Sequence, residues 1–239
     1  MKELAIIIPV YNEEEIIEKV LVDWSKIISI KKFDIIIIND GSKDNTKKII
    51  LKLKQKIKNL ILINKINEGH GKALIMGYRY AQKKKYRFIF QTDSDDQFYS
   101  NDFKKFWRKK DSKKFDIILG DRFKRNDPFL RVFLSRFILS KLLRFYFGKS
   151  TVDANIPYRL ITNKFIKDFL ELRPEKYIAP NIIMTLYAKN IWGIKVKHKK
   201  RDFGEVKWSL KKLVKFGLVL LKDLKTYYIF DKKKNNEKN

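Results

Sequence analysis

The sequence of 239 residues predicts an α/β protein in which a mostly parallel sheet is covered by helices on both faces. Three observations support this fold class. Short apolar runs rich in isoleucine, typical of strands buried on both faces, alternate with longer stretches of helical periodicity. Polar residues follow the apolar runs directly, as they do at the ligand-binding edge of parallel sheets. Hydrophobic residues make up 44% of the chain, which is enough for a sizeable core.

The predicted strands are the apolar runs themselves. Four lie in the first half and one follows later, at Leu4–Val10, 33–42, 59–64, 86–96 and 115–123. The stretches between the first four strands have helical spacing, at 12–27, 44–56 and within 67–84. Asn12 is expected to cap the first helix, with Glu13 at the positive end of its dipole.

The second half is expected to add amphipathic segments. Residues 128–148 and 205–230 carry apolar side chains interrupted by lysine and arginine. This is the pattern of helices that lie at a membrane interface, although the same segments could simply cover the sheet. We therefore expect one domain over residues 1–205, amphipathic helices over 206–230 and a disordered basic tail over 231–239.

The charge balance restricts the partners. The chain has 55 Lys+Arg against 27 Asp+Glu, a formal net charge of +28. An anionic partner is expected: nucleic acid, an anionic membrane surface or a phosphate-bearing substrate.

The absence of cysteine excludes disulfides, thiolate zinc sites and a cysteine nucleophile, and the presence of only two histidines excludes a histidine-rich metal site. No stretch approaches the roughly 18 apolar residues of a membrane-spanning helix. We expect a cytoplasmic protein whose contact with the membrane is peripheral, at its cytoplasmic face.

Two carboxylates follow the fourth apolar run. Asp93 and Asp95 are two residues apart, so in an extended chain their side chains point the same way, as does that of Gln97. Paired carboxylates together with phosphate oxygens suit Mg²⁺ or Mn²⁺. The alternative is a solvated acidic turn.

Other strand ends carry weaker signals. Asp40 is either part of an Asp-Gly turn or an acceptor for a nucleobase or ribose. Gly69 and Gly71 would let a ligand approach the backbone closely, and Lys72 would face phosphate.

Four ordered stretches, "IIIPVYNEEE", "INDGSKDNT", "NEGHGKALIMGYRYA" and "QTDSDDQ", resemble family-2 glycosyltransferases of the GT-A fold. Within that family they look like the polyprenyl-phosphate sugar synthases, the group of dolichol-phosphate mannose synthase. The similarity covers about residues 3 to 210.

The resemblance implies a role for each matching residue. Asp93, Asp95 and Gln97 would bind the metal. Asp93, Asp95, Arg122 and Asp153 would form the catalytic set. The nucleotide sugar would be held by Pro9, Tyr11, Asn12, Glu13, Asp40, Gly71, Lys72, Asp93, Ser94 and Asp95. The acceptor phosphate would be held by Arg122, Arg131, Ser135, His198 and Arg201.

The implied activity is metal-dependent, inverting transfer of a hexose from a nucleotide-diphosphate sugar, of the GDP-mannose or UDP-glucose type, to a polyprenyl or dolichyl phosphate. Such an acceptor is already anionic and needs cations rather than a base, which agrees with the arginines of the second half. An anionic membrane surface is the expected docking partner. The sequence leaves open whether a small membrane protein is a further partner that supplies membrane-spanning helices.

Two other functions remain. One is transfer to a glycan or other hydroxyl, for which Asp153 would be the candidate base. The other is a basic nucleic-acid-binding module, although the aromatic residues follow no stacking-platform pattern, and no nucleic acid is expected.

Overall fold

The computed structural model describes residues 2–27, 33–112, 114–122, 141, 143–144, 148, 153–200 and 210–236. Its strands are β1 (Leu4–Val10), β2 (Phe33–Asp40), β3 (Leu60–Lys65), β4 (Phe88–Gln91), β5 (Ile117–Arg122), β6 (Arg159–Thr162) and β7 (Ile191–Val196). Its helices are α1 (Ile17–Ile27), α2 (Thr46–Lys56), α3 (His70–Lys83), α4 (Phe103–Lys109), α7 (Asn163–Leu170), α8 (Pro180–Tyr187) and α9 (Leu210–Asn236).

The strands form one sheet in the order β3-β2-β1-β4-β6-β5-β7. Neighbouring strands are parallel except where β6 lies between β4 and β5, to both of which it is antiparallel. The predicted mostly parallel sheet is therefore confirmed. Sequence reasoning did not find β6 and β7, nor the short helices α4, α7 and α8.

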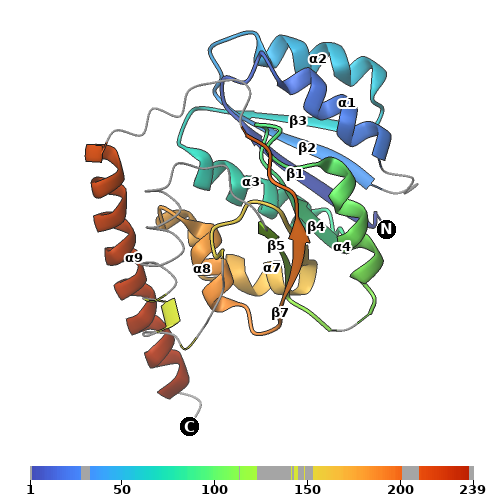
Figure 1. Cartoon of the computed structure of the whole chain (residues 1–239). Coiled ribbons are helices and arrows are strands. Elements are labelled where there is room, and N and C mark those ends of the chain that lie inside the picture. The colour runs from blue at the N-terminus through green and yellow to red at the C-terminus, as the bar shows by residue number, and fades with distance from the viewer. Residues whose placement is uncertain are drawn as a thin grey trace.

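Helices cover both faces of the sheet, as predicted (Figure 1). The central strands are apolar on both sides: every residue of β1 is buried. On one face α3 lies so close to β1 that a Cβ added to Gly77 would stand 2.5 Å from the Ile7 side chain. Glycine at this position therefore permits the close packing of α3 on the sheet.

Aromatic side chains fill the opposite face, beneath α1 and α4. The Phe90 ring of β4 packs edge-on against Phe103, Phe106 and Tyr158, with centroid separations of 4.7–5.5 Å. Trp24 of α1 closes this cluster, at 5.6 Å from Phe90. The cluster joins α1 and α4 to β4, the strand that leads into residues 92–97, here called the acidic loop because it carries Asp93, Asp95 and Asp96.

The C-terminal helix α9 packs through a row of buried side chains, Leu220, Leu224 and Tyr227, and Asp223 accepts a hydrogen bond from the Ile178 backbone at 2.7 Å. In Figure 1 it stands at one edge of the molecule, beside α8. The helix runs to Asn236, so residues 231–236, assigned to the tail from sequence, are helical instead. Lysine, which occupies positions 232–234, is a good helix former.

Two details of the first half differ from expectation. Helix α1 begins at Ile17, and Asn12 is not its N-cap but adopts a positive φ of 54° in the preceding loop. Strand β4 ends at Gln91, before the carboxylates. Among the described residues no helix is long and apolar enough to cross a bilayer. The predicted segment 128–148 lies almost wholly outside the described residues.

Candidate active site

A cleft of about 390 Å³ opens at the carboxyl edge of the parallel strands. This is where α/β sheets bind ligands, because the loops of several strands converge there. Seven of the residues predicted to hold a nucleotide sugar line it: Pro9, Tyr11, Glu13, Asp40, Asp93, Ser94 and Asp95. The remaining lining residues are Val10, Asn67, Gly69, His70 and Ala73.

The loops after β1 and β2 are joined to each other by hydrogen bonds. Asn12 donates its backbone N–H to Ser42 Oγ at 3.0 Å and accepts the Lys43 N–H on Oδ1 at 2.8 Å. Glu14 accepts the N–H of Asn45 at 2.8 Å. Asn12 thus links the loop after β1 to the loop after β2, and these hydrogen bonds hold in place the cleft wall that carries Tyr11.

Asp44 strengthens the same connection. Its two carboxylate oxygens accept the backbone N–H groups of Thr46, at 3.0 Å, and Glu14, at 3.2 Å. Burial by itself would raise the pKa of the Asp44 carboxyl, but these hydrogen bonds outweigh burial and hold the pKa below its ordinary value.

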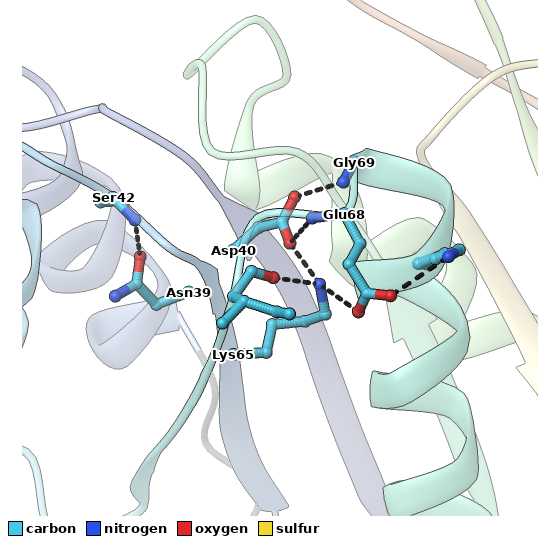
Figure 2. A network of polar contacts seen from close by, with 8 residues as sticks. Asn39, Asp40, Ser42, Lys65, Glu68 and Gly69 are labelled. Atoms are coloured by element: carbon cyan, nitrogen blue, oxygen red, sulfur yellow. Dashed lines mark hydrogen bonds and ion pairs between the residues drawn. The ribbon is translucent and has the colours of Figure 1, made fainter.

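Asp40 anchors the loop after β3 (Figure 2). Its Oδ1 accepts from Lys65 Nζ at 2.5 Å and from the Glu68 N–H at 3.0 Å, and its Oδ2 accepts from the Gly69 N–H at 2.8 Å. The carboxylate that the sequence assigned to the nucleotide thus already organises the protein's own loop. Asn67 and Gly69 reach the cleft because of it.

Lys65 is the buried counter-ion of Asp40. The two side chains are only 5% and 4% exposed. Burial alone would lower the pKa of the Lys65 ammonium, but hydrogen bonds and charges of Asp40 and Glu68 outweigh burial and raise it. Glu68 in turn lies 3.1 Å from Lys72. Lys72 is therefore directed to Glu68 and does not line the cleft.

The acidic loop carries Asp93 and Asp95 into the cleft. Oδ1 of Asp93 is buried, and no described residue donates a hydrogen bond to it; His70 Nε2 lies 3.7 Å away. A buried carboxylate oxygen without a donor is costly unless a cation neutralises it. The described residues contain no group of three or more Asp, Glu or His that could hold a metal alone. The site fits a divalent ion that takes its remaining ligands from a phosphate-bearing substrate.

Two predicted residues lie beside the cleft rather than in its wall. Gln97 is placed by the chain that follows β7, because the Lys199 N–H donates to the Gln97 carbonyl at 2.8 Å. Its own side chain reaches the Lys199 carbonyl at 3.5 Å. Gly71 faces α8, where an added Cβ would stand 3.1 Å from the Pro180 ring.

Arg122 and Asp153 form a buried ion pair. Both Nε and Nη2 of Arg122 lie 2.5 Å from Asp153 Oδ2, and both side chains are under 10% exposed. His198 is buried and packs edge-on against Phe98, with ring centroids 5.2 Å apart. Three other predicted residues, Arg131, Ser135 and Arg201, lie outside the described residues.

Arg159 is fully buried beneath this region, in β6. Its guanidinium donates to backbone carbonyls, including those of Ile156 at 2.9 Å and Asn181 at 3.2 Å. Burial lowers its pKa to about 10, a shift opposed by the negative charges of Asp153 and Asp93. This positive charge therefore acts on the carboxylates of the site from within the core.

Sequence reasoning did not assign His70, Asn67 or Lys65 to the site. His70 and Asn67 stood within a recognised motif and were detectable as polar residues at a strand end. Lys65 gave no signal, because one lysine in a chain with 55 basic residues looks like surface.

Comparison with known proteins places the chain in a family. The sequence profile of glycosyl transferase family 2 matches residues 5–171. An uncharacterized protein of Methanocaldococcus jannaschii is 35% identical over 68% of this chain and 72% of its own length. Undecaprenyl-phosphate 4-deoxy-4-formamido-L-arabinose transferases of Photorhabdus laumondii and Salmonella paratyphi B are 24% and 26% identical, over 95% and 90% of this chain. The chain spans 69% and 65% of those two relatives.

Solved structures show the same fold at low identity. S. aureus TarS in complex with UDP-GlcNAc superposes with a TM-score of 0.63 at 21% identity, over 91% of this chain and 64% of that one. Glucosyl-3-phosphoglycerate synthase of Mycobacterium tuberculosis, in complex with Mn²⁺, UDP and phosphoglyceric acid, superposes with a TM-score of 0.66 at 13% identity. That comparison covers 95% of this chain and 78% of the other.

Proposed function

The chain belongs to glycosyl transferase family 2, and from this premise we propose that it moves a hexose from a nucleotide-diphosphate sugar to a polyprenyl phosphate, with inversion at the anomeric carbon. Its identity as a glycosyltransferase follows from the family. The donor, the acceptor and the need for a metal are proposals, supported by the site and by the relatives' transfer to undecaprenyl phosphate.

The single observation that carries the proposal is the carboxylate pair at the cleft. Asp93 and Asp95 lie where a diphosphate can reach them, and Oδ1 of Asp93 lacks a donor among the described residues. A divalent ion bound there would neutralise the charge that develops on the departing diphosphate. A strongly basic protein thus keeps acidic residues in this cleft for a cation.

The chain's own residues position the donor. Tyr11 is 41% exposed at the cleft wall, so its ring is available to stack on a base. Asn67 and the backbone of Gly69 face the cleft from the loop that Asp40 holds. An added Cβ at Gly69 would contact nothing within 4 Å, so the cleft has room for a ligand there.

The acceptor supplies its own nucleophile. An acceptor phosphate oxygen forms a bond to the anomeric carbon while the bond from that carbon to the donor diphosphate breaks, and the nucleoside diphosphate leaves with the electron pair. No side chain has to remove a proton, because the phosphate is already ionised. Arg122, Arg131, Ser135, His198 and Arg201 are the proposed ligands of that phosphate, with arginine forks suited to its oxygens.

Asp153 is a poor general base for a hydroxyl acceptor. The Arg122 guanidinium lies 2.5 Å from its Oδ2 and occupies an oxygen that such a base would use. This contact favours the phosphate acceptor over a glycan hydroxyl. In our proposal Asp153 instead orients Arg122.

Helix α9 is the proposed membrane-docking element. Besides its buried row, it presents a second apolar row to solvent, Val214, Leu218 and Leu221, at i, i+4 and i+7. Exposed lysines flank this row: Lys215, Lys222, Lys225 and Lys232. Apolar side chains bordered by lysines suit an anionic bilayer surface, where a polyprenyl phosphate presents its headgroup. We propose peripheral attachment on the cytoplasmic face.

The test is transfer to lipid. The protein is incubated with Mg²⁺ or Mn²⁺, a panel that includes GDP-mannose and UDP-glucose, and a short polyprenyl phosphate, and the organic phase is analysed by mass spectrometry. We expect a glycosylated lipid phosphate with the wild type and with Asp111→Ala, an exposed control, but none with folded Asp95→Ala. A sugar that stays in water-soluble products, or normal turnover by Asp95→Ala, would refute the proposal.

A further inference from the structure

The third carboxylate of the acidic loop behaves differently from the other two. Asp96 is absent from the cleft lining, and its side chain is only 12% exposed. Its Oδ2 accepts from Lys19 Nζ of α1 at 2.6 Å and from Lys199 Nζ, beyond β7, at 2.8 Å. One carboxylate therefore ties together two elements that are far apart in the sequence.

The backbone next to Asp96 is held by the same partner segment. Lys199 N–H donates to the Gln97 carbonyl at 2.8 Å, and Phe98 pairs with His198 as an antiparallel bridge. The Lys199 ammonium also lies 4.5 Å from the centroid of the Tyr99 ring. Residues 97–99 and 197–199 thus form a short two-stranded contact directly after the carboxylates.

The conformation of Asp96 requires support. Its φ of 53° lies in the left-handed region, which residues other than glycine rarely adopt. Such a conformation persists only where surrounding contacts determine it. The two ammonium groups bind its carboxylate, and the Gln97 N–H donates to Asp95 Oδ1 at 3.2 Å across the same bend. Together these contacts hold the bend next to Asp93 and Asp95, which line the cleft.

The charges divide accordingly. Three carboxylates within four residues repel one another, and the two lysines neutralise Asp96, which does not line the cleft, whereas Asp93 and Asp95 do. Bonding to Asp96 is the largest influence on the Lys19 ammonium and raises its pKa, against burial, which would lower it. At neutral pH the contact therefore involves a charged lysine.

We propose that Asp96, bridged by Lys19 and Lys199, is a positioning residue that sets the geometry of Asp93 and Asp95 for the divalent ion of the donor. This inference rests on the proposed function for the identity of that ion. The bridge also connects the acidic loop to the segment that bears His198, so the donor and acceptor sides of the site share one fixed point.

The test compares two variants whose charges change in opposite directions. Mn²⁺ affinity is measured by electron paramagnetic resonance with UDP or GDP present, for the wild type, Asp96→Asn and Lys199→Met. If Asp96 positions the loop, both variants bind Mn²⁺ more weakly, by roughly 10- to 100-fold, as for other residues that orient metal ligands. If only long-range charge matters, Lys199→Met binds Mn²⁺ more tightly than the wild type, and the proposal is overturned.

Two further measurements make the result specific. Asp23 is the other carboxylate near Lys19: its Oδ2 lies 3.0 Å from Lys19 Nζ on the surface of α1. Asp23→Asn removes this carboxylate and should leave the Mn²⁺ affinity unchanged. Lys199→Arg keeps a cation at the bridge and should restore most of the affinity that Lys199→Met loses.

Hydrogen–deuterium exchange separates this inference from the proposed function. Amides of residues 93–99 should exchange faster in Asp96→Asn and Lys199→Met than in the wild type or Asp23→Asn, with or without metal. Unchanged exchange in both variants would overturn the positioning role. If both variants exchange faster than the wild type but the wild type binds no Mn²⁺ with either nucleotide, the proposed metal is contradicted and the positioning role of the bridge is established.

Discussion

Replacing Lys65 by methionine should destabilise the protein far more than a surface lysine substitution. The side chains of Lys65 and Asp40 are 5% and 4% exposed, and 2.5 Å separates the ammonium nitrogen from the carboxylate oxygen. Methionine fills the volume of the lysine stem but leaves the Asp40 carboxylate buried without its cation. Removing one partner of a buried pair typically costs about 3–5 kcal/mol.

The remaining contacts of Asp40 place the expected value within that range. In Lys65→Met the backbone N–H groups of Glu68 and Gly69 still donate to the carboxylate. The free energy of unfolding should therefore fall by an amount near the lower end of that range, about 3 kcal/mol. For a chain of this size each kcal/mol shifts the melting temperature by roughly 2–4 °C, so a decrease of about 6–12 °C is expected.

Urea unfolding at neutral pH gives the measurement, with the midpoint compared at constant slope. Lys72→Met is the matched control: it removes the exposed contact with Glu68 and should change the free energy of unfolding by less than about 1 kcal/mol. A double variant, Lys65→Met with Asp40→Asn, should recover part of the loss because no buried charge remains. Equal stability of Lys65→Met and Lys72→Met would refute the buried-pair reasoning.

The other predictions concern the cleft walls and the docking helix. Asp44→Ala should cost about 1 kcal/mol near pH 7 in urea unfolding. The folded pKa of Asp44 lies below its unfolded value, so this stabilisation is full above the unfolded pKa and is lost as pH falls through the folded one; the difference between the two proteins should shrink as pH falls below the unfolded pKa, about 4. Gly41→Ala should cost at least about 1–2 kcal/mol, because φ is +73° and the new Cβ would stand 2.7 Å from the Asn67 nitrogen; stability equal to the wild type would contradict this. Leu218→Glu should weaken sedimentation with anionic vesicles severalfold while Leu51→Glu, an exposed apolar control on α2, should not; equal effects would argue against α9 as the docking helix.

The parts of the fold that sequence predicted are those where apolar residues run continuously. β1, β2, β4 and β5 are mostly buried apolar strands, and the edge strand β3 still carries a run of aliphatic residues. The alternation of strands and helices from β1 to β4 follows from these runs. β6 was not predicted because it begins with Arg159, and arginine is expected at the surface. Here its buried guanidinium donates hydrogen bonds to backbone carbonyls. β7 is a half-exposed edge strand that contains Gly193 and Lys195, so it has neither an apolar run nor clear alternation.

The site was predictable wherever a polar residue ends a strand. Tyr11, Asp40, Asp93 and Asp95 line one cleft, as the parallel topology requires, and the resemblance to family-2 glycosyltransferases is confirmed by the family match. The alternation argument for Gln97 assumed that the strand continues past Gln91, whereas the chain bends there and Asp96 takes a positive φ. A local hydrogen bond from the Gln97 N–H to Asp95 Oδ1 and the tertiary contacts of Asp96 with Lys19 and Lys199 both hold this bend, and the sequence does not reveal the tertiary contacts.

The ligand contacts of several predicted residues depend on partners that no sequence pattern reveals. Asp40 is occupied by Lys65, and Arg122 by Asp153, through pairs that are 25 and 31 residues apart. Their proposed roles toward nucleotide and acceptor phosphate therefore stay predictions. In each pair, a charged side chain that the sequence suggests for ligand binding forms an ion pair within the protein.

The most direct test of the central claim is anomalous diffraction from a crystal soaked with Mn²⁺ and the nucleoside diphosphate that the protein binds. The account predicts a manganese signal beside the carboxylates of Asp93 and Asp95, adjoining the diphosphate in the cleft. A nucleotide bound in the cleft with no signal near these aspartates, or a signal held only by other residues, would contradict it.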